Sequence, residues 1–457
     1  MLNKLIDFGF QERESVNESR YVYRLKKHII QESIYGVDID RSAIDIARLR
    51  LWLSLVVDED DLEPIETLPN LDYKIVCGNS LIGMPDGTMR DLDVEKELEG
   101  LKEEFYTVTD EHRKKELRNK INTKITELLN TAGVFAGYTI DFDFKLYFSE
   151  VWREKGGFDV VIANPPYVQI KQIANSDKEI FKKLFKFTKG RFNLFYLFLE
   201  LGSKLCSNNG VVNQIVPDRI LLNTQCSDIR KWLINDNNLI EIDSFEEQVF
   251  VNAVVDSVIL IYKKGNKANN FFKTRANCNL ENLTKKPIVK IPNEYVLTSP
   301  SNQFDLNYDK SISDVLIKIR ASSVELGTIS ETRDGIIQSK IPDLLFLDEK
   351  INEKCKKLLF GKDIEQFSLI FNENWVHYDI DLMKIEESKR NGGGLRMRNP
   401  SIFERAKILT RQTADRIIGT IDENNYYYSN TLHGTHIQNN AYDSRFVLAQ
   451  LNSVLLN

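Results

Sequence analysis

The sequence predicts an α/β domain built on a parallel sheet, followed by a second domain of mixed α+β structure. Short apolar runs alternate with segments of helical periodicity through the first part of the chain, a pattern typical of α/β domains. Residues 263–303 are then richer in Asn, Lys and Pro, as expected of a boundary. Beyond this boundary the chain has short irregular strands and many aromatic residues. We therefore place the two domains at residues 1–290 and 304–457.

Composition favours a globular protein without a membrane segment. Of the 457 residues, 42% are hydrophobic and 28% are charged. No apolar run reaches the length of a membrane span, and the N-terminus lacks the apolar core of a secretory signal. The five cysteines never occur in CxxC spacing, which favours a reducing cytoplasm and argues against a metal site. The net charge of -6 means that any contact with nucleic acid needs a local basic surface.

The first predicted elements are a strand over residues 33–38 and a helix after it. Apolar residues recur at helical spacing from Ala43 to Trp52, and Asp40 is a suitable N-cap. A second strand over 73–77 runs into Gly78-Asn79-Ser80. The charged residues 91–130 carry apolar positions at helical intervals, and they predict a helical hairpin inserted into the domain.

A third strand is predicted over Phe158–Ala163, which is apolar almost throughout. Such a run suits a strand that is buried on both faces of a parallel sheet. It leads directly into Asn164-Pro165-Pro166-Tyr167. A helix over 192–206 and strands over 210–216 and 254–262 complete the α/β pattern.

The tetrapeptide from Asn164 to Tyr167 carries the clearest chemistry. Ligands of open parallel sheets bind beyond the carboxyl ends of the strands. The Asn164 side-chain oxygen and the Pro165 carbonyl can accept hydrogen bonds from an exocyclic amine, and the prolines fix the backbone. That arrangement holds the lone pair of the amine toward an electrophilic methyl group, while Tyr167 offers an aromatic face for a base. The alternative is a simple Pro-rich turn after a strand.

Weaker signals indicate a nucleoside-containing cofactor. Asp38 ends a strand in the manner of the carboxylates that bind ribose hydroxyls, and Asn79 could bind one edge of an adenine. Phe198 is the ring of the 192–206 helix that could pack on the cofactor. The alternatives are that Asp38 is only a helix cap, that Asn79 only forms a turn and that Phe198 only fills a core.

In combination, these motifs resemble the gamma-class amino-methyltransferases, in particular TaqI-type DNA adenine methyltransferases and the methylase modules of type IIG enzymes. The resembling stretches are IYGVDID, CGNSL, FDVVIANPPY and residues 190–200, 210–217 and 245–261. The resemblance implies a Rossmann-like methyltransferase domain that uses S-adenosylmethionine. It assigns catalytic roles to Asn164, Pro165, Pro166 and Tyr167, cofactor contacts to Asp38, Ile39, Asn79, Ser80 and Phe198, and packing on a flipped base to Phe250. Asn79 stands where family members commonly carry Asp.

The C-terminal half resembles the DNA specificity domain of the same family at residues 359–364 and 407–413. The resemblance implies that this second domain recognises the DNA target. The later stretch lies in a basic run with Arg396, Arg398, Arg405 and Arg416, a pattern that suits phosphate contact. The alternative is an ordinary solvated face. The predicted DNA-binding residues are Lys362, Lys407, Arg411 and Gln412.

Two departures from the family pattern concern whether this sequence contains all the parts of a family member. Members carry a glycine-containing loop before the second motif that wraps the methionine part of the cofactor, whereas Gly9 is the one glycine before Gly36 here. The family's specificity domain also usually continues beyond the position of Asn457. We therefore expect a fragment, a split gene product or a degenerate copy. No PD-(D/E)xK nuclease pattern is evident.

The predicted reaction is methyl transfer from S-adenosylmethionine to adenine N6 in double-stranded DNA, within a restriction-modification or related phage-defence system. The target base must leave the stack to reach Asn164. Candidate partners besides DNA are a restriction endonuclease or a subunit that supplies the missing N-terminal segment. Two alternatives stay open: a non-catalytic DNA-recognition fragment or pseudoenzyme, and methylation of a protein glutamine or an RNA base. The DNA-reader-like second domain argues against the last of these.

Overall fold

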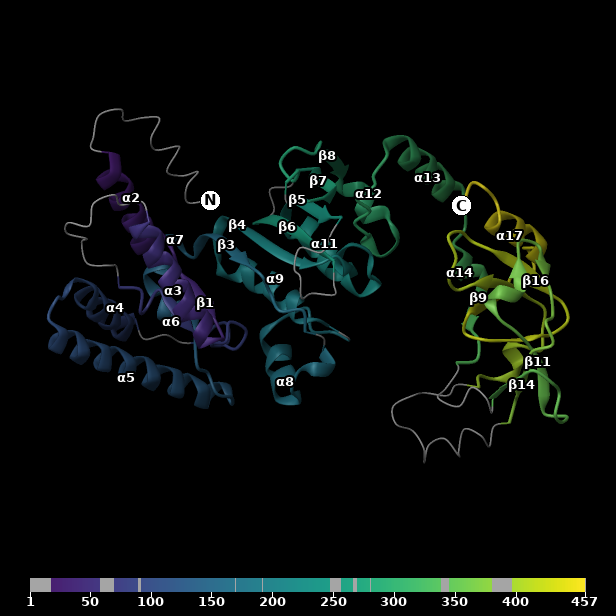
Figure 1. Ribbon diagram of the computed structural model, residues 1–457, viewed down its shortest axis with the longest axis horizontal. Coiled ribbons are helices and arrows are strands. Elements are labelled where there is room, and N and C mark those ends of the chain that lie inside the picture. The colour runs from purple at the N-terminus through teal and green to yellow at the C-terminus, as the bar shows by residue number, and fades with distance from the viewer. Residues whose placement is uncertain are drawn as a thin grey trace. The chain divides into compact units, whose positions relative to one another are not determined.

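The computed structural model describes residues 18–57, 70–88, 92–168, 170–190, 192–246, 256–265, 269–279, 281–337, 345–379 and 397–456. The chain divides into two compact units, Met1–Ser313 and Asp314–Asn457, and Figure 1 labels many of their elements. Unit 1 therefore extends past residue 290, where we placed the end of the first domain. No helix in the described ranges has both the length and the apolar character that a membrane span requires.

The N-terminal part of unit 1 contains a small parallel sheet. Its elements are α2 (Glu18–Ser33), β1 (Gly36–Asp38), α3 (Arg41–Val56) and β2 (Ile75–Cys77). The Asp40 carboxylate accepts the Ser42 N–H at 2.8 Å and so caps α3 as predicted. Both strands are shorter than predicted, because residue 33 closes α2 and residues 73 and 74 form a turn.

The charged segment forms two helices packed on one another, α4 (Leu92–Thr107) and α5 (Glu111–Ala136), in the arrangement expected of a helical hairpin. α5 begins where the Asp110 carboxylate accepts the Arg113 N–H, and it ends at Gly137 in the left-handed conformation. The apolar faces of the pair enclose a core of their own that includes Leu98, Phe105 and Leu117. The short helices α6 (Phe144–Tyr147) and α7 (Ser149–Lys155) follow.

The main sheet of unit 1 has six strands in the order β3-β4-β6-β5-β7-β8. Their bounds are Phe158–Ala163, Cys206–Pro217, Ser257–Lys264, Asn237–Phe245, Phe271–Cys278 and Val289–Pro292, in that order. β3 and β4 run parallel, as do β5 and β7, while the remaining pairs are antiparallel. The sheet is therefore mixed, and the expectation of a parallel sheet holds only for two of its strand pairs.

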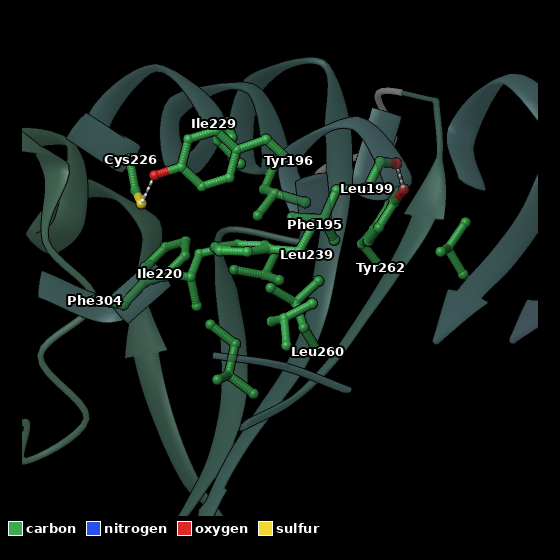
Figure 2. Packing of buried hydrophobic residues seen from close by; sticks show 14 of the residues in the cluster. Phe195, Tyr196, Leu199, Ile220, Cys226, Ile229, Leu239, Leu260, Tyr262 and Phe304 are labelled. Atoms are coloured by element: carbon green, nitrogen blue, oxygen red, sulfur yellow. Dashed lines mark hydrogen bonds between the residues drawn. The ribbon is translucent and has the colours of Figure 1, made fainter. Parts of the chain in front are cut away.

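Helices pack on the main sheet and bury its largest hydrophobic core. They include α8 (Asn175–Leu184), α9 (Leu194–Leu205), α10 (Arg219–Leu222), α11 (Ser227–Asn235) and α12 (Asn293–Thr298). Figure 2 shows this core, in which the Tyr196 hydroxyl lies 3.1 Å from the Cys226 Sγ and the Tyr262 hydroxyl donates to the Leu199 carbonyl. The polar ends of both tyrosines are thus satisfied inside the core.

β3 departs from the sequence prediction. Among the described residues it pairs only with β4, so it is an edge strand of the main sheet. Val160 is 47% exposed and Ile162 is 63% exposed, whereas the apolar run predicted burial on both faces. Burial depends on what lies beside and above a strand, and the described residues place no further strand beside β3. β1 likewise pairs only with β2 in this part of the structure.

Unit 2 is rich in β-structure. One antiparallel sheet has the order β16-β15-β18-β9, with bounds Gly419–Asp422, Lys407–Arg411, Leu432–Ile437 and Ser330–Asp334. A second sheet has the order β10-β14-β11-β17, with bounds Phe346–Leu347, Trp375–His377, Cys355–Leu359 and Tyr427–Tyr428. β12 (Ile364–Glu365) and β13 (Ser368–Leu369) form a short hairpin. The helices of the unit include α14 (Leu326–Ile329) and α17 (Ser444–Leu451), and α13 (Lys310–Ser322) spans the division between the units.

Candidate active site and DNA-contact surface

One cavity of unit 1 runs along β1 and β3 and reaches the loop after β2. β1 and β2 end side by side, with the Gly78 N–H donating to the Asp38 carbonyl at 2.9 Å. A cavity of about 250 Å³ lies between β1 and β3. Its lining includes Val37, Ser80, Ile162, Ala163, Phe198 and Gln214. Ser80 and Phe198, which were predicted from separate motifs, therefore share a cavity with the residue that precedes Asn164.

The loop after β3 presents Asn164 outward. Asn164 is exposed, and the described residues give its side chain no hydrogen-bond partner, while Pro165 is buried. The Tyr167 hydroxyl lies 3.1 Å from the Ser257 Oγ, at the start of β6. The Leu194 N–H donates to the Val168 carbonyl at 3.2 Å, which ties the loop to the beginning of α9. The loop is thus anchored on both sides of a free acceptor.

Desolvation by burial raises the pKa of the Tyr167 hydroxyl. Because the ordinary pKa of tyrosine is already well above neutrality, this hydroxyl stays protonated at neutral pH. Tyr167 is therefore a hydrogen-bond donor and an aromatic surface rather than a base.

The predicted cofactor residues at β1 and β2 lie near the cavity but also make local turns. One Asp38 carboxylate oxygen accepts the Asp40 N–H at 2.8 Å, and the Asn79 Oδ1 accepts the Leu81 N–H at 3.0 Å. Asp38 and Ile39 are exposed. A carboxylate has several lone pairs, and the Asn79 amide keeps its N–H donors. The local turns therefore leave capacity for a ligand at both residues.

Gln214 on β4 is a cavity residue to which sequence reasoning gave no role. Its side chain is 1% exposed, and its Nε2 donates to the Phe198 carbonyl at 2.7 Å. Its Oε1 is buried and has no partner among the described residues. The signal in the sequence was a Gln inside an apolar strand, GVVNQIVP. Gln214 fixes the backbone that carries Phe198 and supplies a buried acceptor at the cavity.

Three of the four predicted DNA-binding residues are brought together in unit 2. Lys362 and Gln412 are exposed. The Gly361 N–H donates to the Thr431 Oγ1 and the Gln412 N–H donates to the Thr431 carbonyl, so both segments meet at one residue. The Arg411 guanidinium donates to the Ile364 carbonyl and pairs with Glu365 at 2.7 Å. We call Lys362, Arg411 and Gln412 the polar cluster.

The sequence prediction that Lys407 binds DNA is wrong. Its side chain is fully buried, and its ammonium lies 2.6 Å from a carboxylate oxygen of Asp422, which is also fully buried. It donates in addition to the Phe403 carbonyl at 2.7 Å. The first three residues of β15, Lys407 to Leu409, are all buried, and Lys407 pairs across the sheet with the buried Asp422, so its ammonium is not available to a phosphate.

Most of the basic run around Lys407 is balanced by acidic partners. Arg398 pairs with Asp334 at 3.3 Å, and Arg405 pairs with Glu331 at 3.2 Å. Arg416 is exposed, while Arg396 lies outside the described residues. Phe250, predicted to pack on the target base, also lies outside them.

Comparison with known families identifies both parts of the chain. Residues 32–250 match the Eco57I restriction-modification methylase family, and residues 356–457 match the TaqI-like C-terminal specificity domain. The chain belongs to the Eco57I/TaqI-like restriction-modification methyltransferases. Its methylase domain contains the cavity and the Asn164 loop, and its specificity domain contains the polar cluster.

Two relatives in sequence agree with this assignment. The chain is 28% identical to the Methanocaldococcus jannaschii protein RM.MjaORFECS2P, over 89% of this chain and 40% of the relative. It is 25% identical to the type II restriction enzyme and methyltransferase RM.Eco57I of Escherichia coli, over 73% of this chain and 30% of the relative. The chain thus spans less than half the length of these relatives. A solved complex of the type IIL enzyme MmeI with DNA is similar at 11% identity and a TM-score of 0.47, covering 99% of this chain and 63% of that one.

Proposed function

We propose that this methylase domain transfers a methyl group from S-adenosylmethionine to N6 of an adenine in double-stranded DNA, as part of a restriction-modification system. One observation carries the proposal. The exposed Asn164 side chain follows the carboxyl end of β3, and the cavity beside that end is lined by Ser80 and Phe198.

The Asn164 loop can position a planar amine. The Asn164 Oδ1 and the Pro165 carbonyl would accept the two N–H groups of the amine. Two acceptors on one side draw the hydrogens out of the ring plane and leave the nitrogen lone pair directed away from them. The buried Pro165 and the anchored Tyr167 keep this geometry fixed before substrate arrives. An adenine inside a duplex cannot reach the loop, so the base must be flipped out.

The residues just beyond the carboxyl ends of β1 and β2, together with Phe198 of α9, suit the nucleoside part of the cofactor. Asp38 has free lone pairs for ribose hydroxyls, Asn79 and Ser80 offer polar groups for the adenine edge, and Phe198 offers a ring surface. The buried Gln214 Oε1 is an acceptor that still needs a donor. S-adenosylmethionine, when bound, supplies the electrophilic methyl group.

We further propose that a partner segment adds a parallel strand between β1 and β3 and carries the turn that holds the methionine end of the cofactor. In the described residues these two strands each have one unpaired edge, and the cavity lies between them. The exposed Val160 and Ile162 give such a strand an apolar surface. A glycine-containing turn at the end of that strand would allow close approach of the backbone to the cofactor.

The partner-strand proposal predicts weak cofactor binding by the 457-residue chain alone. Adding the glycine-loop segment of a relative in trans is expected to restore binding, and Ile162→Lys is expected to block that restoration because it buries a charge at the strand interface. Val134→Lys, on the exposed surface of α5, is the matched control. Isothermal calorimetry with S-adenosylmethionine tests both points. Micromolar or tighter binding by the chain alone would contradict the proposal.

The reaction itself is tested with labelled S-adenosylmethionine and unmethylated bacterial DNA, with the segment present. Digestion to nucleosides and mass spectrometry are expected to find the label in N6-methyladenine. Transfer of the label to RNA or to a protein glutamine in parallel reactions, with none to DNA, would identify that molecule as the substrate instead. Tight DNA binding without any transfer would favour a recognition protein instead.

We propose that the polar cluster contacts DNA phosphates. Lys362→Ala is expected to weaken DNA binding and to reduce the slope of log affinity against log salt by about one, because one phosphate contact is lost. Lys350→Ala, at an exposed lysine of the same unit that pairs with Glu353, is the control. Fluorescence anisotropy across a salt series measures both. Equal slopes for the two variants would remove Lys362 from the interface.

A further inference from the structure

The turn between β12 and β13 holds an aromatic residue in an unfavourable conformation. Gln366 and Phe367 form the turn, and Phe367 has φ of +64°. Four of the eight described non-glycine residues with positive φ are asparagine, which tolerates this region, and Phe367 is the one apolar residue among them. Glycine or asparagine would fit the turn with less strain. Turn geometry therefore does not explain why a phenylalanine occupies this position.

Packing within unit 2 does not explain the phenylalanine either. Phe367 is 60% exposed, and it makes no aromatic contact within the described residues. The next apolar residue after the hairpin, Ile370, is 66% exposed. An exposed aromatic ring on a strained backbone is a feature of binding sites rather than of folding cores.

The backbone beneath the ring is firmly held. The Phe367 N–H donates to the Gly419 carbonyl at 2.9 Å. The Asn452 side chain binds the Gly419 N–H and carbonyl at 2.9 and 2.8 Å, which fixes the strand under the turn. On the other side, Arg411 holds the Ile364 carbonyl and the Glu365 carboxylate. The ring therefore projects from a rigid support.

The surroundings of the turn indicate which partner the ring meets. Arg411 links the hairpin to the polar cluster, and the exposed Arg416 lies in the loop that returns to Gly419. Lys362 immediately precedes the buried Asp363 at the start of the hairpin. The segments that flank the turn thus carry the exposed Lys362 and Arg416, along with Glu365 paired to Arg411. Cations on segments that flank an apolar tip suit DNA, which presents phosphates next to stacked bases.

We propose that Phe367 inserts its ring between base pairs of the bound DNA and so contributes to target recognition by the specificity domain. This inference rests on the proposed DNA binding by that domain. Apolar side chains that enter a base step unstack it, unwind the helix locally and gain stacking area. The strain in the turn and the exposure of the ring are both explained by this role.

The test compares Phe367→Ala, Phe367→Gly and Phe367→Trp with Phe446→Ala. Phe446 is an equally exposed phenylalanine of unit 2, and it lies on the regular helix α17. Anisotropy with a fluorescein-labelled duplex of random sequence measures affinity. Closure of a nicked plasmid by ligase at saturating protein measures unwinding as a shift in linking number. Thermal unfolding measures stability.

The alanine and glycine variants are expected to bind DNA about tenfold more weakly and to lose the linking-number shift. Tryptophan is expected to retain both, and Phe446→Ala is expected to behave as wild type. Phe367→Gly is expected to be as stable as wild type or more so, because glycine accepts the positive φ without strain.

Four results would overturn the inference. Unchanged affinity and unchanged unwinding in the alanine variant would show that DNA binds without Phe367, with the proposed function intact. Loss of stability in Phe367→Gly would assign the ring to packing, and loss of self-association with DNA binding unchanged would assign it to an interface between copies of the chain. If the wild type bound no DNA, the proposed function would fail as well.

Discussion

Replacing Asn164 by alanine is expected to reduce the rate of methyl transfer by about 100-fold or more, while S-adenosylmethionine binding stays largely intact. The loss is large because the Asn164 Oδ1 is one of two acceptors that hold the amine, and removing one preorganised group costs several kcal/mol in the transition state. The variant is expected to fold normally, since Asn164 is exposed and its side chain has no partner among the described residues.

Single-turnover methylation with the partner segment present measures this effect, and calorimetry measures cofactor binding. Asn208→Ala is the matched control, because Asn208 is an exposed asparagine near the opposite end of β4. Turnover that survives in Asn164→Ala would refute the assigned role. A parallel loss of cofactor binding would instead make Asn164 part of the cofactor site.

Replacing Lys407 by alanine is expected to destabilise the specificity domain by about 3–5 kcal/mol, because the Asp422 carboxylate would be left buried and unpaired. Burial lowers the pKa of the Lys407 ammonium, and Asp422 acts in the opposite direction by favouring its charged form. Asp422 also accepts the N–H groups of Asn424 and Tyr426, so the pair organises the turn after β16. Equilibrium denaturation of the chain measures the loss.

The double variant Lys407→Met with Asp422→Asn separates the ion pair from the packing around it. Asparagine keeps an acceptor for the turn, and methionine fills the volume of the lysine stem. This variant is expected to recover most of the lost stability, because no charge remains buried. If Lys407→Ala instead left stability unchanged and weakened DNA binding, the phosphate role inferred from the sequence would be restored.

The sequence by itself determined the local features and the family. Asn164–Tyr167 after an apolar strand, the Asp40 cap and the charged helical hairpin are all set by neighbouring residues, so a short window of sequence is enough to recognise them. The motifs in combination are enough to assign the methylase and specificity domains, and the family comparison agrees.

Tertiary structure decided what each residue is exposed to. Lys407 reads as basic surface, but pairing of β15 with β16 places it against Asp422. The apolar β3 reads as a central strand, but its burial depends on whether a second neighbour is present. The roles proposed for Gln214 and Phe367 depend on hydrogen bonds to a carbonyl on α9 and to a carbonyl on β16, respectively. Burial, pairing and strain arise from residues distant in the chain, and for that reason the sequence alone did not determine them.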